Sequence, residues 1–161
     1  MPKCQNSANA IVFTLDGPVM GWQRAGKGRD GHHFTQKATR EAEDMVGWRA
    51  QQAAAGRFYL DAVAMVVELR IAVPSAWSKA RRAQALSGQV RPVCKPDVDN
   101  VCKALLDGLT GCIWRDDTQV SELTLRRIYA ESAGATVTVW RLATAEAVAP
   151  QSVRPVRVGP A

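Results

Sequence analysis

The sequence predicts a single α/β (α+β) domain, with a mixed sheet of about four strands flanked by helices in the order β-α-β-α-α-β-β. Its 161 residues are enough for one domain with a real core, strand-like and helix-like patterns alternate, and no repeat or linker divides the chain. We expect residues 1–142 to form the domain. Residues 143–161, rich in Ala, Pro, Val and Arg without a period, are expected to form a disordered C-terminal tail.

Alternating apolar residues mark the predicted strands. The alternation is clearest over residues 60–73, so this strand is expected to be central in the sheet. A shorter apolar run over residues 10–15 predicts the first strand. Residues 119–130 and 135–142, joined through a short Ser-Ala-Gly connection, are expected to form an antiparallel hairpin.

Capping residues and apolar spacing predict three helices. The first spans residues 36–55 after Thr35 as N-cap, and the second begins at Pro74-Ser75 and ends before Gly88. Residues 95–100 are expected to be extended, because the residue before a proline avoids helical geometry. The third helix then runs from 100 or 101 to 109, capped by Asp99 or Asn100.

The charge balance predicts a polyanionic partner. Twenty-one Lys and Arg against fifteen Asp and Glu give a net charge of +6, which favours nucleic acid over acidic lipid because no basic amphipathic helix is evident. A glycine-rich loop over residues 17–34 and the second helix carry basic patches that could contact phosphates, although an ordinary solvated surface explains each equally well. The candidate DNA-binding residues are Arg24, Lys27, Arg29, Lys79, Arg81, Arg82 and Lys95.

Several cofactor and location classes are disfavoured. No apolar run reaches the length of a membrane span and the N-terminus lacks a signal-peptide core, so we expect a cytoplasmic protein. The glycine spacing does not match a nucleotide-binding fingerprint, so no nucleotide cofactor is expected. No Cys-x-x-Cys pair or zinc-spaced histidine occurs, and all four cysteines are predicted to be free thiols: Cys4, Cys94, Cys102 and Cys112.

The candidate chemistry is concentrated in residues 95–120. Asp99, Lys103 and Asp107 follow at four-residue steps and therefore share one stripe of a helix. Carboxylates that are brought together favour a cation between them, and oxygen ligands suit magnesium or manganese. Taken singly, each residue has a plainer explanation as a helix cap, a turn or a surface ion pair. The combination favours an active site whose carboxylates are Asp97, Asp99, Asp116 and Asp117.

At these residues the chain resembles the RusA-type Holliday junction resolvases (crossover junction endodeoxyribonucleases) of bacteria and their phages. That family's pattern is Pro-Asp-x-Asp-Asn, a lysine, Asp-x-Leu, and Asp-Asp-x-Gln-Val. Every element is present in order, and a looser resemblance covers roughly residues 10 to 142. The matching residues are Pro96-Asp97-Val98-Asp99-Asn100, Lys103, Asp107-Gly108-Leu109 and Asp116-Asp117-Thr118-Gln119-Val120.

The resemblance implies an endodeoxyribonuclease dependent on Mg²⁺, with Mn²⁺ as a substitute, that acts as a homodimer. Its substrate would be four-way junction DNA, resolved by paired nicks during recombination and repair in a bacterium or a phage-infected cell. Asp97, Asp99 and Asp117 would be the metal-binding catalytic carboxylates and Lys103 an assisting cation. Asp116 is an additional candidate metal ligand.

Three alternatives were compared with this interpretation. The main one is a branched-DNA-binding module without catalysis, in which the carboxylates serve only as caps and turns. A haloacid dehalogenase-type phosphatase is disfavoured because Cys94-Lys95-Pro96 is a poor buried strand before an Asp-x-Asp motif. An EF-hand loop is disfavoured because Val101 and Cys102 stand where an oxygen ligand and a glycine are needed.

Overall fold

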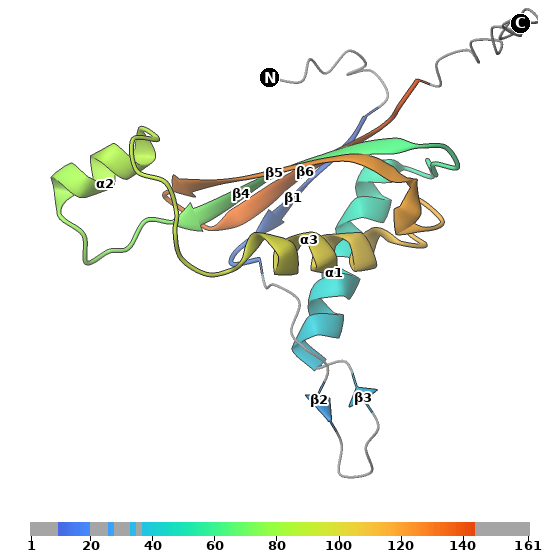
Figure 1. Cartoon of the computed structure of the whole chain (residues 1–161), viewed down its shortest axis with the longest axis horizontal. Helices are drawn as coiled ribbons and strands as arrows, with labels where there is room; N and C mark the ends of the chain where they lie inside the picture. The colour runs from blue at the N-terminus through green and yellow to red at the C-terminus, as the bar shows by residue number, and fades with distance from the viewer. Residues whose placement is uncertain (1–9, 20–25, 28–32, 35–36, 144–161) are drawn as a thin grey trace, which may run out of the picture.

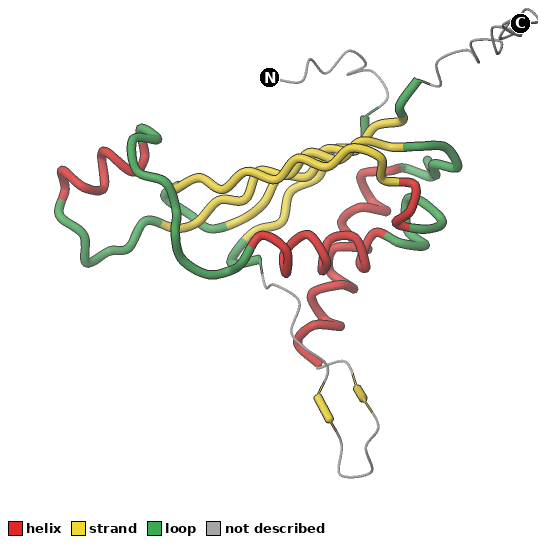
Figure 2. The backbone as a smooth tube through the Cα atoms, in the orientation of Figure 1, coloured by secondary structure: helices red, strands yellow, loops and turns green. Residues whose placement is uncertain are grey.

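The structure, a computed structural model, describes residues 10–19, 26–27, 33–34 and 37–143. It is built on a four-stranded sheet in the order β1-β6-β4-β5. Helices α1 and α3 lie on one face of this sheet, and α2 extends from one end (Figures 1 and 2). The predicted class and element order are confirmed. The bounds are β1 (Ile11–Asp16), α1 (Lys37–Ala54), β4 (Val63–Ala72), α2 (Lys79–Leu86), α3 (Val98–Leu109), β5 (Val120–Ala130) and β6 (Gly134–Arg141).

The predicted hairpin between the last two strands is wrong. Strand β4 lies between them, pairing parallel with β5 and antiparallel with β6. The error has a physical reason, because alternation shows which face each side chain takes but not which strand is its neighbour. The prediction that β4 is an internal strand is confirmed.

Part of the glycine-rich segment predicted as a loop also forms strands. Strands β2 (Gly26–Lys27) and β3 (His33–Phe34) pair antiparallel, with Gly26 opposite Phe34. Two residues are too few to leave a period in the sequence, so alternation could not reveal them.

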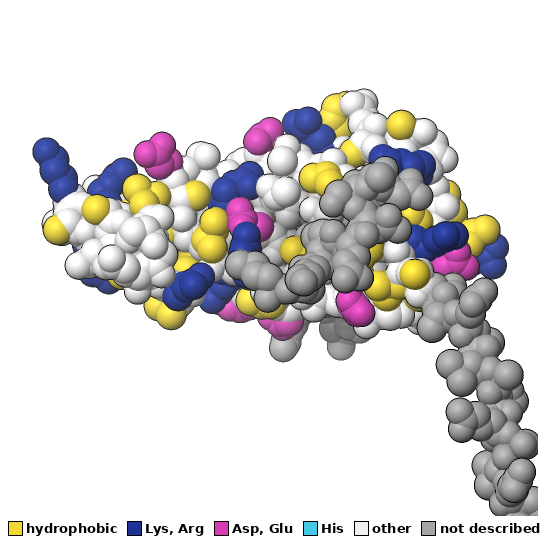
Figure 3. All heavy atoms as spheres, turned by 90° about the horizontal axis from the view of Figure 1, so that it is seen from above, with side chains coloured by type: hydrophobic (Ala, Val, Ile, Leu, Met, Phe, Trp, Pro, Cys, Tyr) yellow, Lys and Arg dark blue, Asp and Glu magenta, His cyan; other side chains and the backbone are white. Residues whose placement is uncertain are grey.

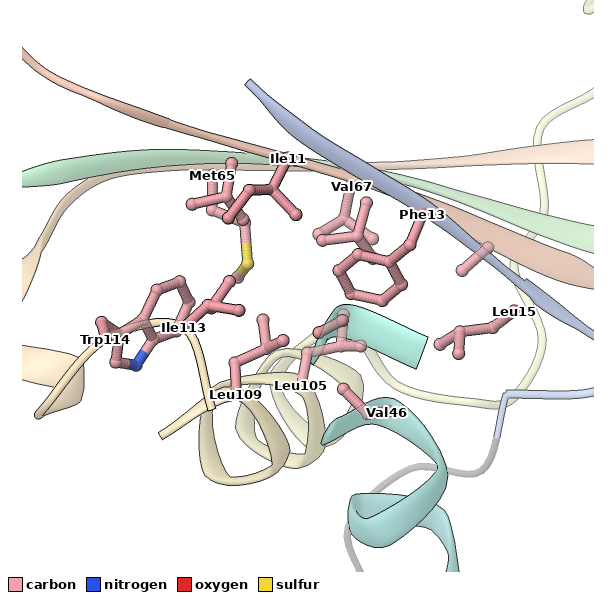
Figure 4. Packing of buried hydrophobic residues seen from close by; sticks show 14 of the residues in the cluster. Ile11, Phe13, Leu15, Val46, Met65, Val67, Leu105, Leu109, Ile113 and Trp114 are labelled. Atoms are coloured by element: carbon pink, nitrogen blue, oxygen red, sulfur yellow. The ribbon is translucent and has the colours of Figure 1, made fainter. Parts of the chain in front are cut away.

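The core lies between the sheet and the two helices (Figure 4). β1 shows strict alternation of buried and exposed residues, as expected for a strand with one face toward helices. Each fully buried large apolar side chain stabilises the fold by roughly 1.5–3 kcal/mol. The largest fully buried side chains are Trp114, Ile11, Met65, Leu69, Leu105, Leu109, Ile113, Val63, Val67, Val101, Val137 and Val139.

Helices α1 and α3 approach each other closely at two glycines. A Cβ on Gly108 of α3 would lie 2.8 Å from the Glu43 carbonyl oxygen, and one on Gly47 of α1 would lie 2.9 Å from the Gly108 carbonyl oxygen. A side chain at either position would push the helices apart. The glycines therefore set the depth at which α3 is seated against α1.

Helix α2 packs on a separate, smaller cluster. Val73, Ala85 and Tyr129 are buried there, and Trp77 packs against them. The helix begins at Lys79, later than the predicted start at Pro74-Ser75, because the Ser78 side chain caps it by accepting from the Arg81 amide. None of the helices in the described ranges is long and apolar enough to cross a membrane.

Helix α3 begins at Val98, two residues before the earlier of the two predicted starts. The N-cap position is taken by Asp97, whose side chain makes no capping hydrogen bond, so the prediction that Asp99 or Asn100 caps the helix is wrong. Pro96 restricts only the residue before it, so the chain can turn into a helix directly afterwards. Asp99 consequently lies inside the first turn.

Candidate active site

Asp97 and Asp99 stand at the N-terminal end of α3. The Asp97 carboxylate is partly exposed and forms an ion pair with Lys95. Asp99 is exposed in the first turn, where the helix dipole and unpaired amides favour negative charge. Two carboxylates are thus presented to solvent at one helix end.

Lys103 lies one turn after Asp99 on the same helix. Its Nζ is 3.5 Å from Oδ2 of Asp107, which confirms that these residues share a stripe. Burial, followed by the nearby carboxylates of Asp107 and Asp44, raises the pKa of Glu43 on α1, and Lys103 opposes this shift. The Lys103 ammonium therefore lies near acidic groups of both helices, Asp107 of α3 and Glu43 of α1.

Asp116 has a structural task at the 3₁₀ turn η2 (Asp117–Gln119), which precedes β5. Its Oδ1 accepts from the Thr118 amide at 2.9 Å, while its own amide donates to Oε1 of Gln119 at 3.1 Å. Hydrogen bonding from Thr118 lowers the pKa of Asp116. Asp117, the next residue, is exposed within the turn.

Gln119 fixes this turn to the rest of the domain. Its side-chain nitrogen donates to the carbonyls of Tyr59 and Asp61, at 3.1 Å each. Sequence reasoning gave it no role, although it belongs to the Asp-Asp-x-Gln-Val pattern. Its bonds hold Asp117 beside the start of β4.

The two acidic groups are Asp97 with Asp99 and Asp116 with Asp117. The first lies at the start of α3, and the second lies beyond its far end. This helix has twelve residues and is about 18 Å long. The Pro96 carbonyl accepts a hydrogen bond from Arg127 of β5. Arg127 lies seven residues from Val120 along this strand, so the Val120 end of β5, next to Asp117, is about 23 Å from Arg127. Among the residues that the structure describes, no three His, Cys, Asp or Glu side chains converge to hold a metal ion. In one chain, therefore, Asp97 and Asp99 both lie at the start of α3, whereas Asp117 lies beyond its far end.

The donor chemistry at the start of α3 nevertheless fits a magnesium ion. Mg²⁺ is commonly held by one or two carboxylates together with waters and substrate phosphate oxygens. Asp97 and Asp99 offer two such carboxylates, and both are accessible to solvent. Asp117 of the same chain is not positioned to join them in this fold.

The candidate DNA-contacting residues fall into two groups. Lys79, Arg81 and Lys95 are exposed and Arg82 is half-buried, and Lys and Arg side chains occur along the molecule, including its α2 end (Figure 3). The guanidinium of Arg81 lies 4.0 Å from the centroid of Trp77, whose ring meets Tyr129 edge-on, so Trp77 is a packing anchor. The side chains of Arg24, Lys27 and Arg29, like Cys4 and residues 144–161 of the proposed tail, lie outside the described part of the chain. The other three cysteines are free thiols.

Sequence reasoning missed Arg127 in β5. Its guanidinium donates to the carbonyls of Cys94, Pro96 and Pro92, at 2.7, 2.9 and 3.0 Å. A signal was present, because Arg127 shares the phase of Leu125 and Tyr129, which pack in the two apolar clusters. A half-buried cation in the apolar phase of a strand needs hydrogen-bond partners, and these are the carbonyls just before Asp97.

The fold, the site and the comparison with known proteins together indicate a class of protein. An α+β domain with exposed carboxylates at a helix start and a basic surface suits a DNA-cleaving enzyme, and residues 16–140 match the family model for endodeoxyribonuclease RusA. The chain belongs to this family. A relative is the uncharacterized protein YqaN of Bacillus subtilis (strain 168), 31% identical over 128 residues, which cover 76% of this chain and 90% of the relative. The resemblance seen in the sequence is thereby confirmed.

Proposed function

We propose that this protein is a metal-dependent endodeoxyribonuclease that resolves Holliday junctions by paired nicks, in DNA recombination and repair. The observation that carries the proposal is the family match over residues 16–140, which includes the acidic motif with its carboxylates and Lys103 exposed on and around α3. Its place of action is the cytoplasm of a bacterium or of a phage-infected cell, where such junctions arise.

Asp97, Asp99 and Asp117 are the proposed holders of Mg²⁺, or of Mn²⁺ in its place, with Asp116 as a neighbour committed mainly to its turn. A divalent ion there supplies Lewis acidity toward the phosphodiester and lowers the pKa of a bound water. Lys103 offsets negative charge on the phosphate as it is attacked. Lys79, Arg81, Arg82 and Lys95 are proposed to hold the DNA backbone.

The separation of the two acidic groups supports a homodimer with a shared site. Asp117 lies beyond the far end of an α3 helix that is about 18 Å long, whereas metal ligands must lie about 2 Å from the ion. We therefore infer that Asp97 and Asp99 of one subunit act together with Asp117 of the partner subunit. A two-fold dimer makes this exchange twice and so forms two equivalent sites, which suits paired nicks in a two-fold junction.

The nuclease assignment is tested with a synthetic four-way junction beside linear duplex of the same sequence, in Mg²⁺ and in EDTA. The native protein should nick the junction in pairs only with metal, and Asp97→Asn should abolish cutting. Glu41→Gln, which alters an exposed carboxylate of α1 that pairs with Lys37, serves as the control. Tight junction binding without cutting in any metal would instead favour a non-catalytic branched-DNA-binding module.

The shared site is tested by mixing Asp97→Asn with Asp117→Asn, each inactive alone. A mixed dimer of this kind contains one site with both substitutions and one with neither. Single-strand nicking should therefore return on mixing, together with high-affinity Mn²⁺ binding measured by electron paramagnetic resonance. If the native protein cuts but mixing restores neither signal, the site is complete within one subunit and the dimeric arrangement is wrong.

A further inference from the structure

The segment that leads into Asp97 has few supports of its own. Residues 91–96 connect α2 to α3 without helix or strand, and Val93, Cys94 and Lys95 are exposed. Among the described residues, no backbone–backbone hydrogen bond joins residues 91–96 to the sheet. Something else must fix the direction in which the chain arrives at the acidic motif.

The side chain of Arg127 binds this segment at every second residue, at Pro92, Cys94 and Pro96. Nη1 of Arg127 donates to the carbonyls of Cys94 and Pro96, and Nη2 donates to the carbonyl of Pro92. The planar guanidinium presents its donors in a fixed fork, so three bonds together define both position and orientation. The last of these carbonyls belongs to the residue immediately before Asp97.

Arg127 is itself held firmly. It lies within β5, which pairs parallel with β4 along its length, with Leu69 opposite Arg127. Its neighbour in the same phase, Tyr129, is buried against Trp77. A rigid strand therefore carries the guanidinium, and the extended segment is bound to that strand.

We propose that Arg127 is a positioning residue for the active site, a role that rests on the proposed function. By fixing residues 92–96 it sets where Asp97 and Asp99 stand at the start of α3. β5 starts three residues after Asp117 and carries Arg127, so a single strand anchors both acidic groups of a subunit. Partners that orient ligands in this way contribute strongly to metal affinity.

The test compares Arg127→Met and Arg127→Lys with Arg126→Met. Arg126 is the matched control, because it is the adjacent arginine on the opposite face of the strand, where it pairs with Glu68. Two readouts are independent of cutting: nuclear magnetic resonance order parameters for the amides of residues 93–95, and the Mn²⁺ dissociation constant. A third readout is the Mn²⁺ concentration that gives half-maximal junction nicking.

For Arg127→Met we expect order parameters that fall from about 0.85 to below about 0.6 in residues 93–95. Mn²⁺ affinity should weaken about tenfold, and the half-maximal metal concentration should rise accordingly. Arg127→Lys keeps the charge but not the fork and should fall between Arg127→Met and the native protein. Arg126→Met should match the native protein in all three readouts.

A uniform loss of thermal stability with unchanged order parameters and Mn²⁺ affinity would overturn the proposal, because it would make Arg127 merely structural. If Arg127→Met does not fold, the graded response of Arg127→Lys decides the question by the same criteria. If the native protein fails to cut any junction, the proposed function is wrong, whereas order parameters and Mn²⁺ binding still decide the role of Arg127.

Discussion

Adjacent aspartates at residues 116 and 117 differ in what they contact. Hydrogen bonds from Thr118 lower the pKa of Asp116 in the folded protein, and its carboxylate caps η2. Asp117 belongs to the turn itself and is exposed. At the residue scale, the first aspartate supports the turn, and the second is left available for chemistry.

This difference predicts a pH effect. Because the folded pKa of Asp116 is lowered, its ionisation stabilises the fold fully above the ordinary Asp pKa of about 3.9, and this stability is lost as pH falls through the lower folded pKa. Asp116→Asn keeps a capping oxygen but cannot titrate. It should therefore reduce the fall in urea midpoint between pH 5 and pH 2, whereas Asp117→Asn should leave that cap-dependent fall in place. The prediction would be contradicted if the urea midpoint fell equally with pH in Asp116→Asn and in the native protein.

Lys103 should matter for cutting rather than for binding. Lys103→Gln removes a positive charge next to the carboxylates of α3, so we expect nicking to slow about a hundredfold while junction affinity in EDTA changes little. The control is Lys37→Gln, since Lys37 forms an i,i+4 pair with Glu41 just as Lys103 does with Asp107. Equal losses of nicking in both variants would show that Lys103 acts only as a surface charge.

At the scale of elements, the close contact between α1 and α3 reverses the usual effect of replacing a helical glycine, here Gly108, by alanine. Gly→Ala inside a helix normally stabilises by about 1 kcal/mol. At Gly108 the new Cβ would meet the Glu43 carbonyl oxygen and the Val46 side chain at 2.8 and 3.0 Å. We expect Gly108→Ala to lower the free energy of unfolding by about 1–3 kcal/mol, as measured in urea. A gain in stability would show that the helices separate at little cost.

The elements also show what sequence patterns can and cannot reveal. The long, regular alternation in β4 predicted an internal strand, and β4 does pair with a strand on each of its edges. The same kind of pattern gave the wrong partner for β5, since a short connection fits a hairpin and gives no sign that β4 occupies the space between. Asp97 and Asp99 were predicted together because they are close in sequence. The distance to Asp117 depends on α3 being straight and on Trp114 being buried at its far end, which no local pattern contains.

At the scale of the whole molecule, the basic groups of the α2 end should set the salt dependence of junction binding. If Lys79 and Arg82 each neutralise one phosphate, replacing either by Gln should reduce the slope of log affinity against log salt by about 0.9. Lys37→Gln on α1 is the control. Affinities measured from 50 to 200 mM salt in EDTA provide the comparison. An unchanged slope would show that α2 does not contact the DNA.

The position of β6 also affects how a newly made chain can fold. β1 leaves the ribosome first, yet among the described strands its partner is β6, the last one synthesised. β6 also separates β1 from β4, so the sheet cannot close around its core until nearly the whole domain has emerged. A nascent chain therefore exposes the apolar faces of β1 and β4 throughout translation. The sheet against which α1 and α3 pack can therefore be complete only after most of the domain has been synthesised.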